Sequence, residues 1–385
     1  MSWTLATSPT DEDNTWTSVT VSSTGQYIAL TETSGNLYVS SKYGTTWNLS
    51  NYSFPNGMAP IIMSDSGQYM YTFSGYGLYK SSNFGADWQY IYSGYDILSV
   101  AVSGSGQYVY GVSSNFYNSG FAVILYSSSD YGSTWGQKST IIFGSGNPGN
   151  FRLATSSNAK YVAISASYNI IGYGSYEVYI SSDYGASLTT HGIASNQSPT
   201  VISLSMSSTG QYLVVSIFYE GIYVSLDYGA SWQLSNAATN IYSVSMSGNA
   251  AVIAAGSIGY VYLGTFPLTS SPIIDPTMNP TPSTVSSPTL LPSLKTEKPL
   301  QVFTYRPSTA SPTTATPTRP TPSPSSLPTI LPTINVQYDW SASFQASDLT
   351  SSMFVSISKS GAYIGAVSVS DQGGPIYLSN NGGES

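Results

Sequence analysis

Few residues of this chain could do acid–base chemistry, and they are widely spaced. Three acids, Asp96, Glu177 and Glu220, stand outside the repeated motifs of the sequence. Glycoside hydrolysis needs two carboxylates on either side of the scissile bond, about 5–10 Å apart. Because an isolated surface acid is usually only a solvated side chain, these three leave hydrolysis open and do not establish it.

Other catalytic and metal-ligating groups are almost missing from the sequence. There is no cysteine, and the single histidine, His191, cannot build a histidine metal cluster. No serine lies in the Gly-x-Ser-x-Gly turn of a serine hydrolase. We therefore expect no catalytic residues, no metal and no cofactor.

The overall composition restricts the partners of the protein. Charged residues make up only 7% of the 385 residues, so Ser, Thr, Asn, Gly and Tyr must form most of the surface. The net charge of −8 argues against a phosphate-binding surface, which needs clustered Lys and Arg. No apolar run reaches the roughly 18–20 residues of a membrane-spanning helix, and no signal peptide is recognisable at the N-terminus. We expect neither a nucleic-acid partner nor a membrane span in this chain.

An eight-residue motif, here called the box, repeats along the chain. It reads Ser-Ser-Asp-Tyr-Gly-Ser-Thr-Trp at 128–135 and recurs at 40–47, 81–88, 181–188 and 225–232. Self-similarity at about 40–50 residues is typical of propellers and solenoids. The positions that define the box are Ser40, Gly44, Trp47, Ser81, Asn83, Gly85, Trp88, Ser128, Asp130, Gly132, Trp135, Ser181, Asp183, Gly185, Ser225, Asp227, Gly229 and Trp232.

Each repeat predicts four β-strands around its box. Strand A alternates apolar and polar residues, and a turn such as that at 23–27 leads to an apolar strand B. Strand C has the pattern apolar-Tyr-x-Ser and runs into the box, whose tryptophan opens strand D. Four antiparallel strands with glycine-bearing turns make up the blade of a β-propeller. The predicted fold class is therefore all-β, a propeller of four-stranded antiparallel blades.

The strand count predicts six blades in residues 1–265. A–B–C triplets begin near residues 17, 59, 98, 151, 201 and 241, but only five D strands follow a box. The sixth triplet ends at 260–263 with no box after it. Because residues 2–5 read like the start of a D strand, we expect this N-terminal segment to pair with 260–263 and close the last blade. Closure would remove the free sheet edges that invite aggregation.

The composition changes sharply after the sixth triplet. Pro, Thr and Ser dominate residues 266–335, a composition that cannot bury a core and predicts a disordered linker. The segment is similar to an O-glycosylated stalk, which favours an extracellular or cell-surface protein, and an unmodified linker fits as well. In 336–385 the strand pattern restarts at Trp340 and stops within a box at 379–385, which predicts the truncated start of a second propeller.

The box resembles the Asp-box, or BNR repeat, written Ser-x-Asp-x-Gly-x-Thr-Trp. At the third position of the box, Asp130, Asp183 and Asp227 keep the acid. Asn83 keeps a hydrogen-bond acceptor at this position, and Lys42 has none. Proteins with such boxes include sialidases, sortilin-type receptors, xyloglucanases built of two propellers and photosystem II assembly factors. They share a fold and not a function. The resemblance implies a structural box, in which the acid accepts hydrogen bonds of its own turn, the glycine takes a positive φ and the tryptophan packs between sheets.

The resemblance leaves several functions to weigh. Sialidases clamp the substrate carboxylate with three arginines, but Arg306 and Arg319 lie in the predicted linker and leave only Arg152. We therefore expect a non-catalytic binding propeller rather than a sialidase. Two alternatives stay open: a two-propeller glycoside hydrolase acting on a polysaccharide, and a scaffold like the photosystem II assembly factors.

The expected ligand surface is the face opposite the boxes. In an A–B–C–D meander the A–B turns and the boxes lie on one face, and the B–C and D–A loops lie on the other. Those loops, longest in the third and fourth repeats, are rich in Tyr, Ser, Gly and Asn like antibody binding loops, although tyrosine could also be the generic surface residue of this chain. We expect a protein or carbohydrate ligand and a monomeric protein. The predicted contacts are Tyr76, Tyr95, Asp96, Phe116, Tyr117, Tyr168, Tyr173, Phe218 and Tyr219.

Overall fold

The structure is a computed structural model, and it distinguishes two compact units in the chain. One comprises Met1–Thr269 with Val336–Ser385, and the other is Ser270–Asn335. The predicted linker, residues 266–335, lies outside the described residues. Among the described residues there is no helix that could cross a membrane. The described residues are 3–6, 9, 15–52, 54, 60–74, 77–92, 97–117, 120–143, 147–170, 173–193, 201–236, 238, 240–265, 339–345, 351–369 and 374–382.

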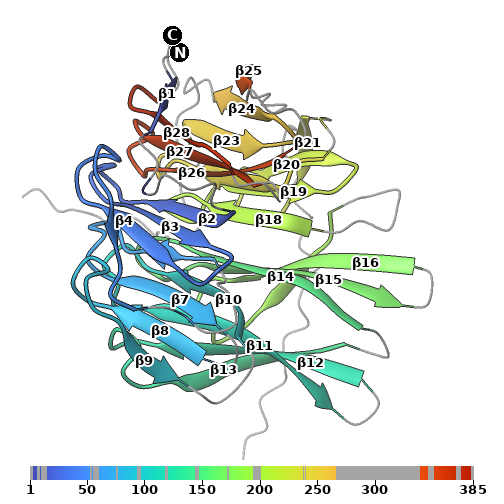
Figure 1. The fold of residues 1–385 in the computed structure, drawn as a ribbon. Coiled ribbons are helices and arrows are strands. Elements are labelled where there is room, and N and C mark those ends of the chain that lie inside the picture. The colour runs from blue at the N-terminus through green and yellow to red at the C-terminus, as the bar shows by residue number, and fades with distance from the viewer. Residues whose placement is uncertain are drawn as a thin grey trace, which may run out of the picture. The chain divides into compact units, whose positions relative to one another are not determined.

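The described residues form seven four-stranded antiparallel sheets, the blades of a β-propeller (Figure 1). In each blade the strands lie in the order A, B, C, D. Blade 1 consists of β2 (Trp16–Val21), β3 (Ile28–Glu32), β4 (Leu37–Ser40) and β5 (Asn48–Leu49). Blade 2 consists of β6 (Ile62–Met63), β7 (Met70–Ser74), β8 (Gly77–Ser81) and β9 (Gln89–Tyr92). Blade 3 consists of β10 (Ile97–Val102), β11 (Val109–Tyr117), β12 (Gly120–Ser128) and β13 (Gly136–Phe143).

The remaining blades repeat the same order of strands. Blade 4 consists of β14 (Asn147–Thr155), β15 (Val162–Ile170), β16 (Tyr173–Ser181) and β17 (Thr189–His191). Blade 5 consists of β18 (Val201–Met206), β19 (Leu213–Ile217), β20 (Gly221–Ser225) and β21 (Gln233–Asn236). Blade 6 consists of β22 (Ser243–Met246), β23 (Val252–Gly256), β24 (Tyr260–Thr265) and β25 (Asp339–Gln345). Blade 7 consists of β26 (Ser352–Ile357), β27 (Ile364–Val369), β28 (Ile376–Ser379) and β1 (Trp3–Leu5).

The seven A strands form the inner wall of a closed ring. Each A strand contacts the A strand of the next blade, and β26 of blade 7 contacts β2 of blade 1. Serine hydroxyls connect several of these strands: Ser99 Oγ accepts the N–H of Leu153 at 3.1 Å, and Ser205 Oγ accepts that of Met246 at 3.1 Å. The small polar residues that alternate along the A strands therefore satisfy backbone groups that no neighbouring strand of their own sheet reaches.

The prediction of six blades is wrong, because the ring has seven. Strand D of blade 6 is β25, which follows the Pro-rich segment and pairs with β24 from Tyr260↔Gln345 to Thr265↔Asp339. The segment predicted to begin a second propeller instead completes blade 6 and supplies strands A, B and C of blade 7. The error has a physical origin: the Pro-rich segment is inserted within one blade, between strands C and D, where the other blades carry a box.

The N-terminal strand does close the last blade, but its predicted partner at 260–263 is wrong. β1 pairs with β28 through Trp3↔Ser379, Thr4↔Leu378 and Leu5↔Tyr377. Figure 1 shows the blue β1 beside the red β28. Each terminus thus contributes strands to the same sheet, and the seventh blade has its full set of four strands.

Burial decreases from strand B to strand D in blades 1 to 6, where the structure describes the burial of both strands. All five residues of β3 and of β19 are buried, because both faces of strand B are covered by neighbouring blades. In contrast, both residues of β5 are exposed. The apolar clusters lie between blades, as where Trp16 and Leu30 of blade 1 pack with Val367 of blade 7. This distribution explains why strand B reads as a continuous apolar run in the sequence.

Candidate functional site

The side chains of the box serine and the box acid form their hydrogen bonds within their own turn. Ser128 Oγ accepts the N–H of Gly132 at 2.7 Å, and in the other four boxes the equivalent serine oxygen lies 2.8–2.9 Å from the glycine nitrogen. Asp130 accepts the backbone N–H of Thr134 at 2.8 Å and its hydroxyl at 2.7 Å. These bonds, that of the Thr134 backbone first, lower the pKa of Asp130 to about 2. We propose that the box acids are structural, because their oxygens already accept the donors of their own turns.

The aromatic residue of the box has a role that the sequence did not reveal. It adopts a left-handed backbone in all five boxes, with φ between 54° and 62°. Its N–H donates to the A–B turn of its own blade, as from Tyr131 to the carbonyl of Gln107 at 2.9 Å. A left-handed non-glycine residue is strained by about 1–2 kcal/mol, so other contacts must hold it there.

Those contacts are aromatic pairs between neighbouring blades. The box ring of one blade lies against the turn tyrosine of the preceding blade, at five of the seven blade interfaces among the described residues. Such pairs contribute about 0.5–1.5 kcal/mol each, which offsets much of the backbone strain. The pairs are Tyr27–Phe84 (4.4 Å between ring centroids), Tyr69–Tyr131 (4.6 Å), Tyr108–Tyr184 (5.9 Å), Tyr161–Tyr228 (4.7 Å) and Tyr363–Tyr43 (5.3 Å).

The A–B turns form a collar around the propeller axis on the box face. The N–H of one turn donates to the carbonyl of the next at 2.8–2.9 Å, from blade 1 through to blade 7. Lys359 forms an ion pair with Asp65 at 2.8 Å, and its ammonium also donates to Ser157. This side chain therefore connects blades 7, 2 and 4 across the axis. The collar residues are Ser23, Asp65, Gly104, Ser157, Ser208, Gly248 and Lys359.

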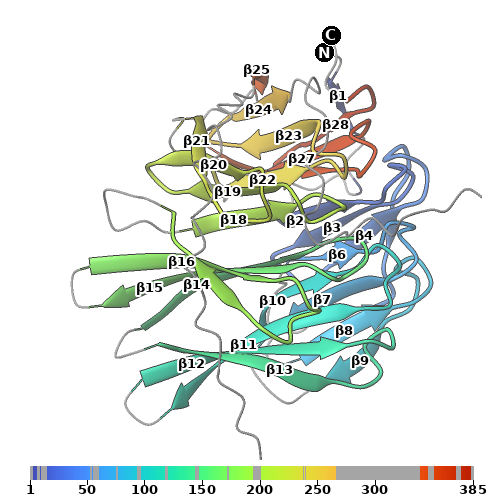
Figure 2. The ribbon, with the colours of Figure 1, turned by 180° about the vertical axis from the view of Figure 1, so that it is seen from behind.

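The opposite face, predicted to hold a ligand, is dominated by two long B–C hairpins. The β11–β12 ladder continues to Tyr117↔Gly120, and the β15–β16 ladder continues to Ile170↔Tyr173. In blade 5 the corresponding ladder ends at Ile217↔Gly221. Figure 2 shows the hairpins of blades 3 and 4 reaching past the other blades. The predicted excess length of these two repeats therefore forms regular strands.

The nine predicted contacts differ in how far the structure describes them. Tyr76, Tyr95 and Asp96 lie outside the described residues. The backbones of Phe116, Tyr117, Tyr168 and Tyr173 belong to the two long hairpins. Phe218 and Tyr219 form the B–C turn of blade 5, where their rings lie 4.2 Å apart.

The turn of blade 5 presents a well-defined aromatic surface. Tyr219 has a φ of 66° and is 67% exposed. The Phe218 ring lies 5.7 Å from that of Tyr242, in the D–A connection before β22. Glu220 accepts a hydrogen bond from the Tyr223 hydroxyl at 3.1 Å. The turn therefore combines a B–C and a D–A segment, as the strand order predicts for this face.

The other charged residues considered from the sequence are held by neighbours in their own blades. Glu177 accepts a hydrogen bond from the Tyr179 hydroxyl. The Arg152 guanidinium donates to the carbonyl of Phe151 at 2.9 Å, and burial lowers its pKa. His191 lies within hydrogen-bonding distance, 3.0 Å, of the Thr189 hydroxyl. Among the described residues, no three acids or histidines are grouped as a metal site would require.

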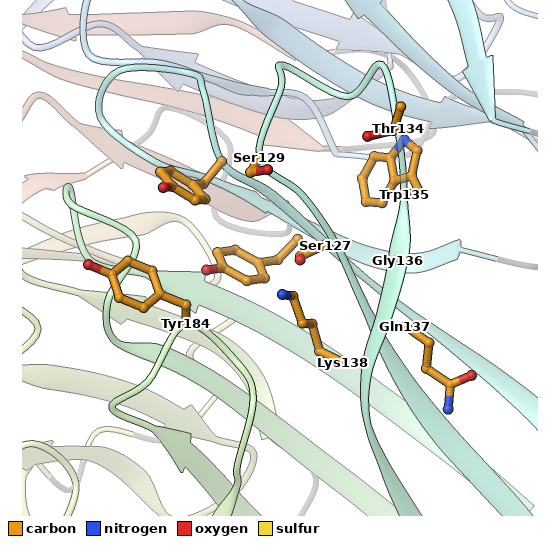
Figure 3. A pocket seen from close by; sticks show the side chains of 10 residues that line it. Ser127, Ser129, Thr134, Trp135, Gly136, Gln137, Lys138 and Tyr184 are labelled. Carbon is orange, nitrogen blue, oxygen red and sulfur yellow. The ribbon is translucent and has the colours of Figure 1, made fainter. Parts of the chain in front are cut away.

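Two clefts lie between blades on the box face. One, of about 310 Å³, separates blades 3 and 4 (Figure 3). Its lining is Tyr108, Tyr110, Ser127, Ser129, Thr134, Trp135, Gly136, Gln137, Lys138 and Tyr184. The other, of about 360 Å³, separates blades 7 and 1 and has a more apolar lining. Its lining is Val21, Ile28, Tyr43, Thr45, Tyr363, Ile364, Leu378, Ser379 and Asn380.

Comparison with known proteins shows the fold alone. No family model and no curated protein matches this chain. Among solved structures, an ancestral GH74 enzyme is similar with a TM-score of 0.50 and 15% identity, over 68% of this chain and 38% of that one. Hydrazine synthase of Kuenenia stuttgartiensis is similar with a TM-score of 0.50 and 13% identity, over 63% of this chain and 80% of that one. The chain thus spans less than half the length of the GH74 enzyme.

Proposed function

We propose that this chain is a non-catalytic binding propeller that holds its ligand on the B–C and D–A face. The observation that carries the proposal is the pair of extended hairpins in blades 3 and 4, which end in Phe116, Tyr117, Tyr168 and Tyr173. Binding residues are commonly found on loops that a rigid scaffold holds in place. The exposed ring of Tyr219 in blade 5 adds to the same face.

The chemistry of this face favours a protein or a glycan as ligand. Tyr presents large contact area at low entropic cost, and Ser, Gly and Asn provide adaptable hydrogen bonds. Because only 7% of the residues are charged, few side chains can form ion pairs with a ligand. Aromatic anchors would then supply most of the binding energy.

The test is a glycan and protein array probed with the full chain. A Tyr117→Ala/Tyr173→Ala double variant should lose the strongest signal while its melting temperature stays unchanged. A Tyr43→Ala/Tyr131→Ala variant removes two rings on the box face and should keep the signal below its melting temperature, which the loss of two interblade ring pairs should lower. If binding were lost only in the Tyr43→Ala/Tyr131→Ala variant, the ligand would lie on the box face, and the proposal would be refuted.

A second candidate is a two-propeller glycoside hydrolase, which the likeness to a GH74 enzyme favours at the level of the fold. Asp96, Glu177 and Glu220 are the acids that this chain could supply to a catalytic pair. Release of reducing ends from xyloglucan, abolished by Glu220→Gln, would support the hydrolase and refute the binding-only function. The Asp-box superfamily and a scaffold role like that of photosystem II assembly factors stay proposals that rest on the box sequence.

A further inference from the structure

The residues that line the cleft between blades 3 and 4 differ in type from their counterparts in the other blades. The residue before the box serine faces the box glycine of the next blade. Val39 Cγ2 lies 2.7 Å from where a Cβ on Gly85 would stand, and Ile180 and Leu378 fill the same place in blades 4 and 7. In blade 2 this residue is Lys80, which donates to the carbonyl of Tyr131 at 2.9 Å. In blade 3 it is Ser127, which lines the cleft, and Leu125 takes the place beside Gly185, its Cδ2 lying 2.8 Å from where a Cβ would stand.

A second position adds a polar group to the same space. Ile91 in strand D of blade 2 packs against the box glycine of blade 3. The equivalent residue of blade 3, three residues after the box tryptophan, is Lys138. Its side chain is exposed and forms no ion pair among the described residues. Figure 3 shows Lys138 turned into the cleft towards Ser127, while Gln137 points away.

The walls of the cleft combine aromatic faces with hydroxyl groups. The rings of Tyr108 and Tyr184 lie 5.9 Å apart at an angle of 37°. Tyr110 is buried at the base, and its hydroxyl donates to the carbonyl of Ala159 at 3.0 Å. Ser129 and Thr134 are exposed and also line the cleft, and the Thr134 hydroxyl donates to Asp130. A ligand here must offer an apolar face for the rings and polar edges for the hydroxyls and the ammonium.

Negative charge is in excess around the cleft. Burial raises the pKa of Tyr110, and Tyr108, Tyr184 and the carboxylate of Asp183 raise it further, so its hydroxyl stays protonated. Thr134 donates to the carboxylate of Asp130. Asp130 and Asp183 thus lie beside lining residues of a cleft that holds the single ammonium of Lys138, and this excess of negative charge disfavours an anion. The volume of about 310 Å³ is at the lower end of small-ligand sites, which span about 300–1,000 Å³.

We propose that the cleft between blades 3 and 4 binds one hexopyranose residue of a neutral glycan. Such a sugar has a face of C–H groups that fits the rings of Tyr108 and Tyr184. Its hydroxyl edge would accept from Lys138 and exchange hydrogen bonds with Ser127 and Ser129. This site lies on the box face and does not depend on the function proposed for the opposite face.

The test uses the full chain and a panel of methyl hexopyranosides with gluco, galacto, manno and N-acetylgluco configurations. Methyl glucuronide serves as the anionic comparison, and dissociation constants come from NMR titration. At least one neutral pyranoside should bind with saturation and more tightly than the glucuronide. No saturable binding of any neutral sugar, or tighter binding of the glucuronide, would overturn the proposal.

Two variants locate the site. Ser127→Leu introduces the side chain that Leu378 supplies in blade 7, and Lys138→Met removes the exposed ammonium. Each should weaken binding at least about tenfold, while Lys42→Met, another exposed lysine, should leave it unchanged. If Ser127→Leu lowers the melting temperature, its loss of binding could come from unfolding, and the location of the site is then judged from Lys138→Met alone. Parental affinity in Lys138→Met would overturn the assignment, and parental affinity in the Tyr117→Ala/Tyr173→Ala variant would separate this site from the opposite face.

Discussion

Removing the N-terminal strand should open the ring at blade 7. Deletion of residues 1–6 removes all three residue pairs between β1 and β28, together with the bond from Ala6 N to Ile376 O at 2.9 Å. About four ladder hydrogen bonds at a net ~1 kcal/mol each correspond to a loss of about 3–4 kcal/mol. For a domain of this size, the melting temperature should fall by on the order of 10 °C.

The assay for this deletion is denaturant unfolding together with size-exclusion chromatography. The exposed edge of β28 should also promote self-association, because an unpaired edge strand accepts strands from other molecules. Deletion of residues 1–2 alone removes no part of β1 and serves as the matched control. A 1–6 deletion variant that unfolds like the parent and elutes as the parent does would refute ring closure through β1.

Further predictions concern the turns of the box face. Gly25→Ala should lower the free energy of unfolding by about 2–5 kcal/mol, because a Cβ at this φ of +78° would stand 2.1 Å from the Tyr363 ring. Gly192 has open space around it and provides the control: Gly192→Ala should change the free energy of unfolding by less than about 0.5 kcal/mol. Equal effects in the two variants would contradict the cross-blade packing. The carboxyl of Asp130 should titrate in the folded protein near pH 2, below its ordinary value of about 3.9, so its contribution to stability is complete above about pH 4 and is lost as the pH falls through 2. An NMR titration with a midpoint near the ordinary value, or an Asp130→Asn variant with unchanged acid unfolding, would contradict it.

The blade architecture could be predicted from the sequence because each repeat carries its own turn chemistry. The glycine and serine of a box and the alternation of strand A are local signals, and they identified strands A to D in five blades. The ring size could not be predicted in the same way. Pairing of β25 with β24 and of β1 with β28 joins segments far apart in the chain, and a Pro-rich insertion inside blade 6 reads as a domain boundary.

The candidate sites, too, could be predicted from the sequence only where their signals are local. The long hairpins of blades 3 and 4 follow from the spacing of the boxes. The polar lining of the cleft includes Ser127 and Lys138, which stand out only when they are aligned with Lys80 and Ile91 of the preceding blade. Comparing the residues before the box serines would have shown that blade 3 carries a serine where the other boxes carry Val39, Lys80, Ile180, Val224 and Leu378. The strained backbone of the box aromatics depends on rings of the neighbouring blade, and no local pattern encodes it.

Hydrogen–deuterium exchange of the full chain, with and without the strongest ligand from the array, tests the binding face most directly. Ligand contact with the B–C hairpins should slow exchange of the amides at 112–124 and 164–177, which span the ends of β11–β12 and β15–β16. Amides of the collar and of the boxes in blades 1, 2 and 5 should exchange at unchanged rates. Protection confined to the box face, with the two hairpins unaffected, would contradict the proposed function.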